Sequence, residues 1–274
     1  MASVMVLTMP DTVAIAGPSG SIPRAALVTG AAKRLGRAMA EDLGALGFAV
    51  AVHYNRSARE AAATVAAIRE KGARAVALKA DLAREAEVKT LIARAEKALG
   101  PLGVLVNNAS TFEHDEALTA TRKSWDFHIE PNLRAPFLLA QEFARRLPAK
   151  AEGVVVNLLD QRVWSLTPHF VSYTVSKYAL WGLTQTLALA LAPRIRVNGI
   201  GPGPTLPSPR QTRAQFLRQF RAMPLGRGAT PAEVCAGLRY ILGARAMTGQ
   251  MIALDGGQHL AWSLPAASAG TIAE

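Results

Sequence analysis

Runs of Val, Ile, Leu and Ala recur along the chain and alternate with longer segments whose apolar residues follow a helical period. A continuous apolar run bounded by turn residues is typical of a strand buried on both faces, as in a parallel sheet covered by helices. The predicted strands are Ala25–Thr29, Ala49–Tyr54, Ala75–Lys79, Val104–Asn107, Val154–Leu158, Arg196–Ile200 and Met251–Leu254. The predicted helices are Leu35–Leu46, Glu60–Lys71, Glu85–Leu99, Leu133–Leu147, Tyr173–Leu191 and Pro231–Leu242.

The alternation has no repeat and no linker, so it predicts one doubly wound α/β domain of the Rossmann type, a seven-stranded parallel sheet with helices on both faces. We expect this domain over residues 23–262, after a loosely ordered arm at 1–22 and before a tail at 263–274. Gly201–Thr212 is the long irregular segment, with four prolines and two glycines, and it continues into Arg213–Met223. A loop of this length inside a compact domain is usually functional, so residues 201–223 are predicted to form a substrate loop with a short helical lid.

The cysteine content and the first residues of the chain limit the class of protein to which it can belong. The single cysteine, Cys235, excludes an internal disulfide framework and a Cys-rich metal site. The first twenty-odd residues are apolar but are interrupted by Pro10, Asp11, Pro18 and Pro23, without a basic flank or a run of membrane-spanning length. We therefore expect a cytoplasmic protein that does not bind membranes, with a signal peptide as the alternative.

The formal net charge of +11 has two interpretations. It indicates either a surface for nucleic acid or another anion, or an arginine-rich solvated surface. The basic residues are scattered over many segments and form no stripe interleaved with aromatic residues, which favours the solvated surface.

A glycine-containing turn follows the first predicted strand and opens a helix. It reads Thr29-Gly30-Ala31-Ala32-Lys33-Arg34-Leu35-Gly36. Gly30 permits a tight turn, Gly36 lets the helix approach the sheet, and the free N–H groups at the start of the helix favour a pyrophosphate. Arg34 stands where the commonest dinucleotide fingerprint has its middle glycine. An ordinary strand-to-helix turn is the alternative interpretation.

The second predicted strand ends in His53-Tyr54-Asn55-Arg56-Ser57, without the acidic residue that holds the ribose hydroxyls in NAD-binding folds. Arg56, helped by Asn55 and Ser57, could pair with a 2′-phosphate, because a guanidinium matches phosphate geometry by two hydrogen bonds. This pattern predicts NADPH/NADP⁺ as the cofactor. A solvated loop arginine is the alternative.

Further motifs follow in the order of a known family. They are Asp81-Leu82, Asn107-Asn108-Ala109, Asn132, Tyr173-x-x-x-Lys177 and Pro202-Gly203. With these motifs the chain resembles the short-chain dehydrogenases/reductases over nearly the whole domain. Together with the phosphate turn and the second strand, the resemblance implies cofactor contacts from Gly30, Arg34, Leu35, Gly36, His53, Asn55, Arg56, Ser57, Asp81, Leu82, Asn108, Ala109, Ser110, Lys177, Pro202 and Gly203.

Within that family the chain is similar to the pteridine reductases and the bacterial dihydromonapterin reductases. The features shared with this subgroup are Arg34 in the turn, the run His-Tyr-x-Arg-Ser, and Asn-Ala-Ser-x-Phe at residues 108–112. The resemblance implies that Arg34 reaches the cofactor phosphates and faces the pterin pocket, that Ser110 lies at the floor of the site, and that Phe112 stacks on the pterin. A plain core or loop phenylalanine is the alternative for Phe112.

Tyr173 and Lys177 are four residues apart, so on a helix they share a face. An ammonium group beside a phenol stabilises the phenolate and makes the tyrosine a proton donor or acceptor near neutral pH, as reduction by hydride transfer requires. By resemblance, Asn132 holds a water that links Lys177 to solvent. The alternative is that Asn132 caps a helix kinked after Pro131.

Asp160 lies 13 positions before Tyr173, where most reductases of the family have a serine. A carboxylate beside a ketone oxygen would repel the developing alkoxide, whereas the N–H groups of a pterin would welcome an acceptor, and a carboxyl group can relay a proton to a ring nitrogen. The pteridine reductases share this aspartate. The predicted catalytic residues are Asp160, Tyr173, Lys177 and Asn132, and the predicted substrate contacts are Arg34, Ser110, Phe112, Asp160 and Tyr173.

The sequence also bears on metal binding and on the oligomeric state. His114, His128 and His169 show no metal-ligand spacing in the sequence, so we interpret them as surface or pocket-rim residues and expect no metal. The segment 248–257 resembles the last strand of the family, which commonly packs in a tetramer interface, and this implies a homotetramer.

The sequence therefore predicts an NADPH-dependent reductase of a dihydropterin or related pteridine. Three alternatives stay open. They are a carbonyl reductase of the same family acting on a ketoacyl or sugar substrate, a non-catalytic NADPH-binding regulator, and a nucleic-acid-binding protein suggested by the charge.

Overall fold

The computed structural model describes residues 22–208 and 210–261. Its sheet has seven strands, all parallel, in the order β3-β2-β1-β4-β5-β6-β7, which confirms the predicted single α/β fold. The predicted C-terminal tail and, apart from Ile22, the predicted N-terminal arm lie outside the described residues. The strands are β1 Ala25–Val28, β2 Ala49–Tyr54, β3 Ala75–Lys79, β4 Val104–Asn107, β5 Gly153–Leu158, β6 Ile195–Pro202 and β7 Met251–Leu254.

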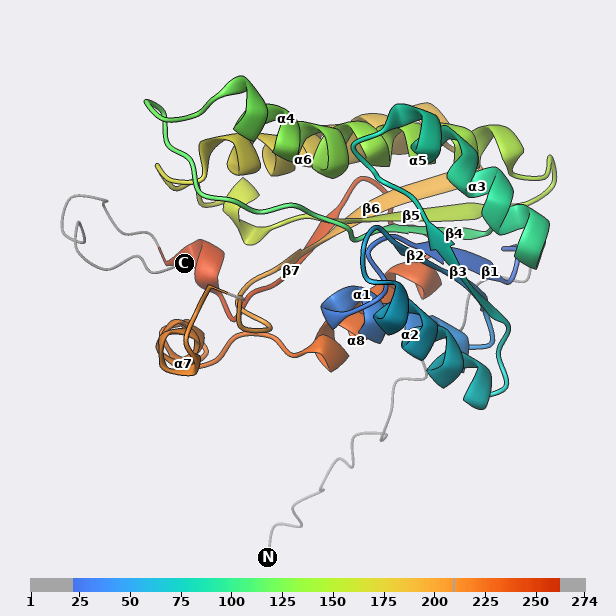
Figure 1. The fold of residues 1–274 in the computed structure, drawn as a ribbon, viewed down its shortest axis with the longest axis horizontal. Helices are drawn as coiled ribbons and strands as arrows, with labels where there is room; N and C mark the ends of the chain where they lie inside the picture. Colours follow the sequence, from blue (N-terminus) through green and yellow to red (C-terminus); the bar gives the residue numbers. More distant parts are fainter. Residues whose placement is uncertain (1–21, 209, 262–274) are drawn as a thin grey trace, which may run out of the picture.

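Helices cover both faces of the sheet (Figure 1). One layer holds α1, α2 and α8, and the other holds α3, α4, α5 and α6. The central strands β1, β4 and β5 are buried along their whole length, whereas β3, at the edge of the sheet, buries only Ala75 and then alternates partly exposed and exposed residues. The α-helices are α1 Arg34–Ala45, α2 Ala58–Glu70, α3 Glu85–Leu99, α4 Arg122–Ile129, α5 Ala135–Arg146, α6 Val171–Leu191, α7 Arg213–Arg221 and α8 Pro231–Gly243. Three short helices are η1 Glu130–Arg134, η2 Gln161–Val163 and η3 Gln258–Leu260.

The strand order places the site. β1 pairs with β2 on one side and with β4 on the other, so the chain reverses its winding direction between β1 and β4. In a doubly wound sheet the connections leave the carboxyl ends of the strands in opposite directions at this point, and a crevice opens between them. The turn after β1 and the loop after β4 border this crevice.

The helix predicted at Leu133–Leu147 corresponds to α5, but the sequence analysis missed the helical structure before it, which begins at Arg122. Thr121 caps α4: its hydroxyl accepts from Ser124 N at 3.1 Å, and the Ser124 hydroxyl accepts from Thr121 N at 3.0 Å. The segment is polar, and His128 is its one buried residue. The apolar periodicity that reveals a helix is therefore missing from it.

Between α4 and α5 the helix widens into the π-helical turn η1. Pro131 lies in this turn and has no N–H to give to the carbonyl four residues earlier, that of Phe127. Instead, the hydroxyl of Thr111 donates to that carbonyl at 2.5 Å. The proline thus explains both the wider turn and the attachment of the loop after β4 to this helix.

The substrate loop ends in a helix, as the sequence predicts. Thr212 caps α7, and its hydroxyl accepts from Gln215 N at 3.2 Å. β6 runs to Pro202, two residues further than the predicted strand. No helix in the two described ranges is both long enough and apolar enough to span a membrane.

Candidate active site

A cavity of about 520 Å³ lies at the carboxyl ends of the central strands. It is bordered by the turn after β1, the loops after β4 and β5, and the loop after β6. Of the residues predicted for the site, those that line the cavity are Gly30, Arg34, Leu35, Gly36, Asn108, Ala109, Ser110, Phe112, Asp160, Tyr173, Pro202 and Gly203.

The phosphate turn is closely packed against the loop after β4. Gly30 has φ +62°, in the left-handed region that favours glycine. A Cβ at Gly36 would lie 2.3 Å from the Gly30 carbonyl oxygen and 2.4 Å from Nδ2 of Asn108. Thr29, which the sequence analysis did not assign to the site, binds the two loops together, because its hydroxyl accepts from Asn108 N at 2.9 Å and from Ala109 N at 3.0 Å.

The start of α1 suits an anion. Its N-cap residue, Lys33, makes no side-chain capping bond, and the first turn contains no acidic residue. The N–H groups of this turn and the positive end of the helix dipole therefore face the cavity that Lys33, Arg34 and Gly36 line. This arrangement fits the pyrophosphate of a dinucleotide, as the motif predicts.

Arg34 has a left-handed backbone, with φ +56°, although it is not a glycine. Its guanidinium lines the cavity and donates to the carbonyls of Pro207 at 2.7 Å and Leu206 at 3.2 Å. Partial burial lowers the pKa of Arg34 from its usual range. The side chain thus connects the phosphate turn to the substrate loop across the cavity.

His53 lies beneath the phosphate turn and does not line the cavity. Gly30 N donates to its Nδ1 at 3.0 Å, so Nε2 carries the proton and donates to the Ala80 carbonyl at 3.1 Å. Burial lowers the pKa of His53 to about 4, and the ring is neutral near pH 7. The residue fixes the turn against the ends of β2 and β3.

The other residues predicted to hold the adenosine half of the cofactor lie at the ends of β2 and β3. Arg56 is exposed, and Ser57 caps α2 without a side-chain bond, so both are accessible to a phosphate. Nδ2 of Asn55 donates to Oδ1 of Asp81 at 3.3 Å, and Leu82 is buried beside them. Arg56 and Ser57 fit a 2′-phosphate on the ribose. They follow β2, the strand at whose end NAD-binding folds have a carboxylate that would repel this phosphate.

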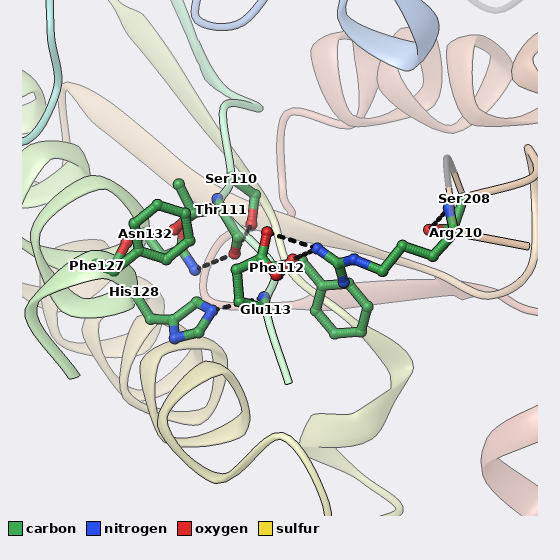
Figure 2. A network of polar contacts seen from close by, with 9 residues as sticks. All are labelled: Ser110, Thr111, Phe112, Glu113, Phe127, His128, Asn132, Ser208 and Arg210. Atoms are coloured by element: carbon green, nitrogen blue, oxygen red, sulfur yellow. Dashed lines mark hydrogen bonds and ion pairs between the residues drawn. The ribbon is translucent and has the colours of Figure 1, made fainter. Parts of the chain in front are cut away.

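The loop after β4 is held by Asn132 (Figure 2). Oδ1 of Asn132 accepts from Thr111 N at 2.8 Å, and its Nδ2 donates to the Thr111 carbonyl at 3.0 Å and to the Ser176 hydroxyl at 3.1 Å. Asn132 therefore lies on the π-helical turn and is not a helix cap. By holding Thr111 on both sides it positions Ser110 and Phe112 at the cavity, and its predicted water link to Lys177 stays a prediction.

Arg210 closes the substrate loop over the same segment, as Figure 2 shows. Its Nη2 donates to the Phe112 carbonyl at 2.5 Å and lies 2.6 Å from Oε1 of Glu113. With Arg34 on the other side of the cavity, two arginines connect the substrate loop to the two sides of the crevice. Neither connection was visible in the sequence, because each joins loops far apart along the chain.

Asp160, Tyr173 and Lys177 meet at the end of β5. The Tyr173 hydroxyl donates to Oδ2 of Asp160 at 2.9 Å. Nζ of Lys177 is buried, donates to the Leu158 carbonyl at 2.7 Å and lies 5.9 Å from the centre of the Tyr173 ring. Burial lowers the pKa of Lys177 to about 8, and the nearby Asp160 carboxylate opposes that shift. The three predicted groups are therefore neighbours in space.

Aromatic rings form one wall of the site. Phe112 stacks on Phe170 with ring centres 4.5 Å apart and meets Tyr173 edge-on at 4.5 Å. Arg162, which the sequence analysis missed, is buried among these rings, 5.4 Å from the centre of Phe112 and 5.1 Å from that of Phe170. Its Nε lies 3.9 Å from Oδ1 of Asp160. The sequence feature that could have pointed to Arg162 was its position two residues after Asp160, next to apolar residues.

The expectation that His114, His128 and His169 lie at the surface or the pocket rim was wrong for one of them. His128 is not a surface or rim residue: it is fully buried, its Nε2 accepts from Glu113 N at 2.9 Å, and its Nδ1 lies 2.6 Å from the Ser172 hydroxyl. Burial lowers its pKa. His114 is exposed and His169 partly exposed, and the fold brings both beside Glu116, although no spacing in the sequence indicates a cluster.

The comparison with protein families decides the classification. Residues 24–216 match the family model described as short chain dehydrogenase. The chain belongs to this family. It is an oxidoreductase of the short-chain dehydrogenase type, as the order of its motifs predicts.

Two solved structures are similar in sequence and shape. The FolM alternative dihydrofolate reductase 1 of Brucella canis, complexed with NADP, is 48% identical, with a TM-score of 0.86, and the match covers 90% of this chain and 98% of that chain. The corresponding enzyme of Brucella suis, also with NADP, is 49% identical, with a TM-score of 0.85 and coverage of 89% and 97%. NADP is also the cofactor that the sequence predicts here.

A third similar protein has a different activity. The 3-oxoacyl-[acyl-carrier-protein] reductase FabG of Staphylococcus epidermidis is 30% identical over 242 residues, which cover 86% of this chain and 99% of that protein. These three similar proteins are all named reductases, two of dihydrofolate and one of a 3-oxoacyl substrate.

Proposed function

We propose that this protein is an NADPH-dependent reductase that acts on a dihydropterin or a related pteridine. The observation that carries the proposal is the hydrogen bond of 2.9 Å from the Tyr173 hydroxyl to Oδ2 of Asp160, beside the Phe112 ring. The names of the two Brucella structures, which share about half of their sequence with this chain, support the same substrate class.

Reduction of a C=N bond adds a hydride to carbon and a proton to nitrogen. When bound, NADPH supplies the hydride. The proton passes from the Tyr173 phenol through the Asp160 carboxyl group to the ring nitrogen, and the buried ammonium of Lys177 stabilises the phenolate that remains. Phe112 offers a flat apolar surface to the pteridine ring, and the substrate loop, held by Arg34 and Arg210, excludes water.

The Asp160 carboxylate selects the substrate. It accepts from the N–H and amino groups of a pteridine, whereas a ketone presents only an acceptor oxygen on which negative charge develops. An interaction that repels the transition state lowers kcat/KM for the ketone. The geometry thus favours the nitrogen heterocycle.

The second candidate is a ketoacyl reductase. The observation that favours it is the 30% identity, over nearly the whole length, to the FabG protein. Under this alternative, Tyr173 would protonate an alkoxide directly and Asp160 would not face the substrate.

Substitution of Asp160 distinguishes the pteridine reductase from the ketoacyl reductase. Asp160→Ser restores the residue that most of the family has, and Asp160→Asn keeps size and shape but removes the charge. We expect both variants to lose most of their kcat/KM with a dihydropterin, and Asp160→Ser to gain on a 3-oxoacyl thioester. Unchanged pterin turnover in Asp160→Ser would refute the proton relay.

The homotetramer is also a proposal. It rests on the likeness of the segment 248–257 to the family's last strand, of which β7 and the turn after it are now described. Sedimentation velocity of the full chain tests it, with a monomer at micromolar concentration as the contrary result.

A further inference from the structure

Three side chains with metal-binding groups converge beside the active site. His114 and Glu116 lie in the connection between β4 and α4, and His169 lies just before α6. Nδ1 of His169 is 3.0 Å from Oε1 of Glu116, and Nε2 of His114 is 3.5 Å from the same oxygen. One nitrogen or oxygen from each of the three residues lies within 4.8 Å of the others.

The two distances to Glu116 are close to those between ligands in a transition-metal site. Zinc binds imidazole nitrogens and carboxylate oxygens at about 2.0–2.2 Å, so two ligands of a tetrahedral site lie about 3.3 Å apart. The two distances to Glu116 bracket this value. Two imidazoles and one carboxylate make a ligand set that zinc and related ions prefer, and they leave one position for water.

Buried contacts hold the two loops in place. Asp115, between His114 and Glu116, is buried: its Oδ1 accepts from Ser172 N at 3.1 Å, and its Oδ2 accepts from the Ser172 hydroxyl. Since Asp115 points inward, its two neighbours are left on the outer side of the loop, where they are more exposed. The same anchor fixes the start of α6, which follows His169, so the backbone segments that carry the three side chains are held next to each other.

An ion pair between one histidine and Glu116 explains less of this arrangement than a metal site does. The pair of His169 and Glu116 needs only one imidazole, yet His114 turns a second one toward the same carboxylate oxygen. A second pair, His259 with Asp255 at 2.7 Å, provides the contrast, because the described residues place no other histidine or acidic group with it in a metal-ligand cluster.

We propose that His114, Glu116 and His169 bind a divalent transition-metal ion of the zinc type. The site reaches the cavity through the aromatic wall: the His114 ring meets Phe170 edge-on at 4.9 Å, and Phe170 stacks on Phe112. The binding itself does not depend on the proposed function.

The test uses the full chain without an affinity tag, stripped with a chelator and titrated calorimetrically with Zn²⁺, and then with Co²⁺ for its visible absorption bands. We expect one saturable site and the intense bands of a tetrahedral Co²⁺ centre. His114→Ala and His169→Ala should each weaken binding more than about tenfold, because even partners outside the coordination shell are worth that much. Glu116→Gln tests the oxygen ligand.

His259→Ala is the matched control, because it removes a histidine paired with a carboxylate outside this cluster, and it should leave binding unchanged. The absence of saturable binding, or equal affinity in the wild type and in both His114→Ala and His169→Ala, would overturn the proposal. Circular dichroism confirms that each variant is folded. Failure of the metal site and failure of the pteridine assignment are separate results, since the titration needs no substrate.

Discussion

The phenol oxygen of Tyr173 and the carboxylate of Asp160 are joined by a hydrogen bond of 2.9 Å, although the two residues are 13 positions apart, Asp160 after the end of β5 and Tyr173 in the first turn of α6. Asp160 caps the short helix η2, its Oδ1 accepting from Arg162 N at 2.9 Å, and the second oxygen is left for the tyrosine. The local fold thus aims one carboxylate oxygen at the Tyr173 hydroxyl.

Tyr173→Phe removes the proton donor and keeps the ring that packs against Phe112. We expect kcat to fall by about 10²–10⁴, the usual contribution of a positioned acid. Steady-state kinetics checks the fall, and fluorescence titration with NADPH serves as a control that should change little. Turnover close to that of the wild type would contradict the acid role.

Arg56→Ala removes the guanidinium predicted to pair with the 2′-phosphate. Charge-assisted hydrogen bonds are worth about 1.5–3 kcal/mol, so the ratio of kcat/KM with NADPH to that with NADH should fall by about one to two powers of ten. Arg122→Ala removes another exposed arginine, at the start of α4, and is the matched control. An unchanged cofactor ratio in Arg56→Ala would show that this arginine is only a solvated loop residue.

We predict that deprotonation of Lys177 lowers kcat at alkaline pH. Its pKa is lowered to about 8 by burial, so the ammonium that we propose stabilises the phenolate loses its proton as the pH rises through that value. We expect kcat to decline above about pH 8, where an unperturbed lysine would keep its charge. Profiles of kcat on both sides of this pH check the prediction, which a plateau extending to the range of a free lysine would exclude.

His53 makes stability depend on pH. Its pKa is about 4 in the folded protein, below the value of 6.5 for the free side chain, so the unfolded chain binds more protons between these values. The free energy of unfolding therefore falls as the pH drops from 6.5 toward 4, by on the order of 3 kcal/mol from this residue. The contribution is fully present above pH 6.5.

Denaturant unfolding of the wild type and His53→Gln across this range isolates the effect. Glutamine keeps an acceptor and a donor but does not titrate, so the difference between the two proteins should shrink as the pH falls. His128 has a lowered pKa as well and contributes in the same direction in both proteins, so it cancels. A difference that is independent of pH would be the contrary result.

The sequence predicted the parallel sheet because strands buried on both faces read as continuous apolar runs, and the seven predicted strands are those observed. It predicted most of the cavity for a related reason. The turn after β1, the loop after β4 and the end of β5 all lie at the carboxyl ends of strands, which a doubly wound sheet brings together.

Contacts between loops could not be predicted in this way. The bonds from Arg34 to the carbonyls of Leu206 and Pro207, and the placing of Arg162 among three aromatic rings, depend on the paths of irregular segments. The start of α4 was missed because a polar segment beside a proline-containing π turn has no apolar period. His128 was misplaced because nothing local reveals that Ser172 and Glu113 enclose it.

The most direct test of the central claim is the rate of NADPH oxidation by the purified wild-type chain with dihydrobiopterin, dihydromonapterin and dihydrofolate, each compared with a 3-oxoacyl thioester at matched concentration. Our account predicts turnover of at least one of the pteridines with a kcat/KM well above that for the thioester. Turnover of the thioester alone would contradict it, and would leave the fold and the pair of Tyr173 and Lys177 in place without the pteridine substrate.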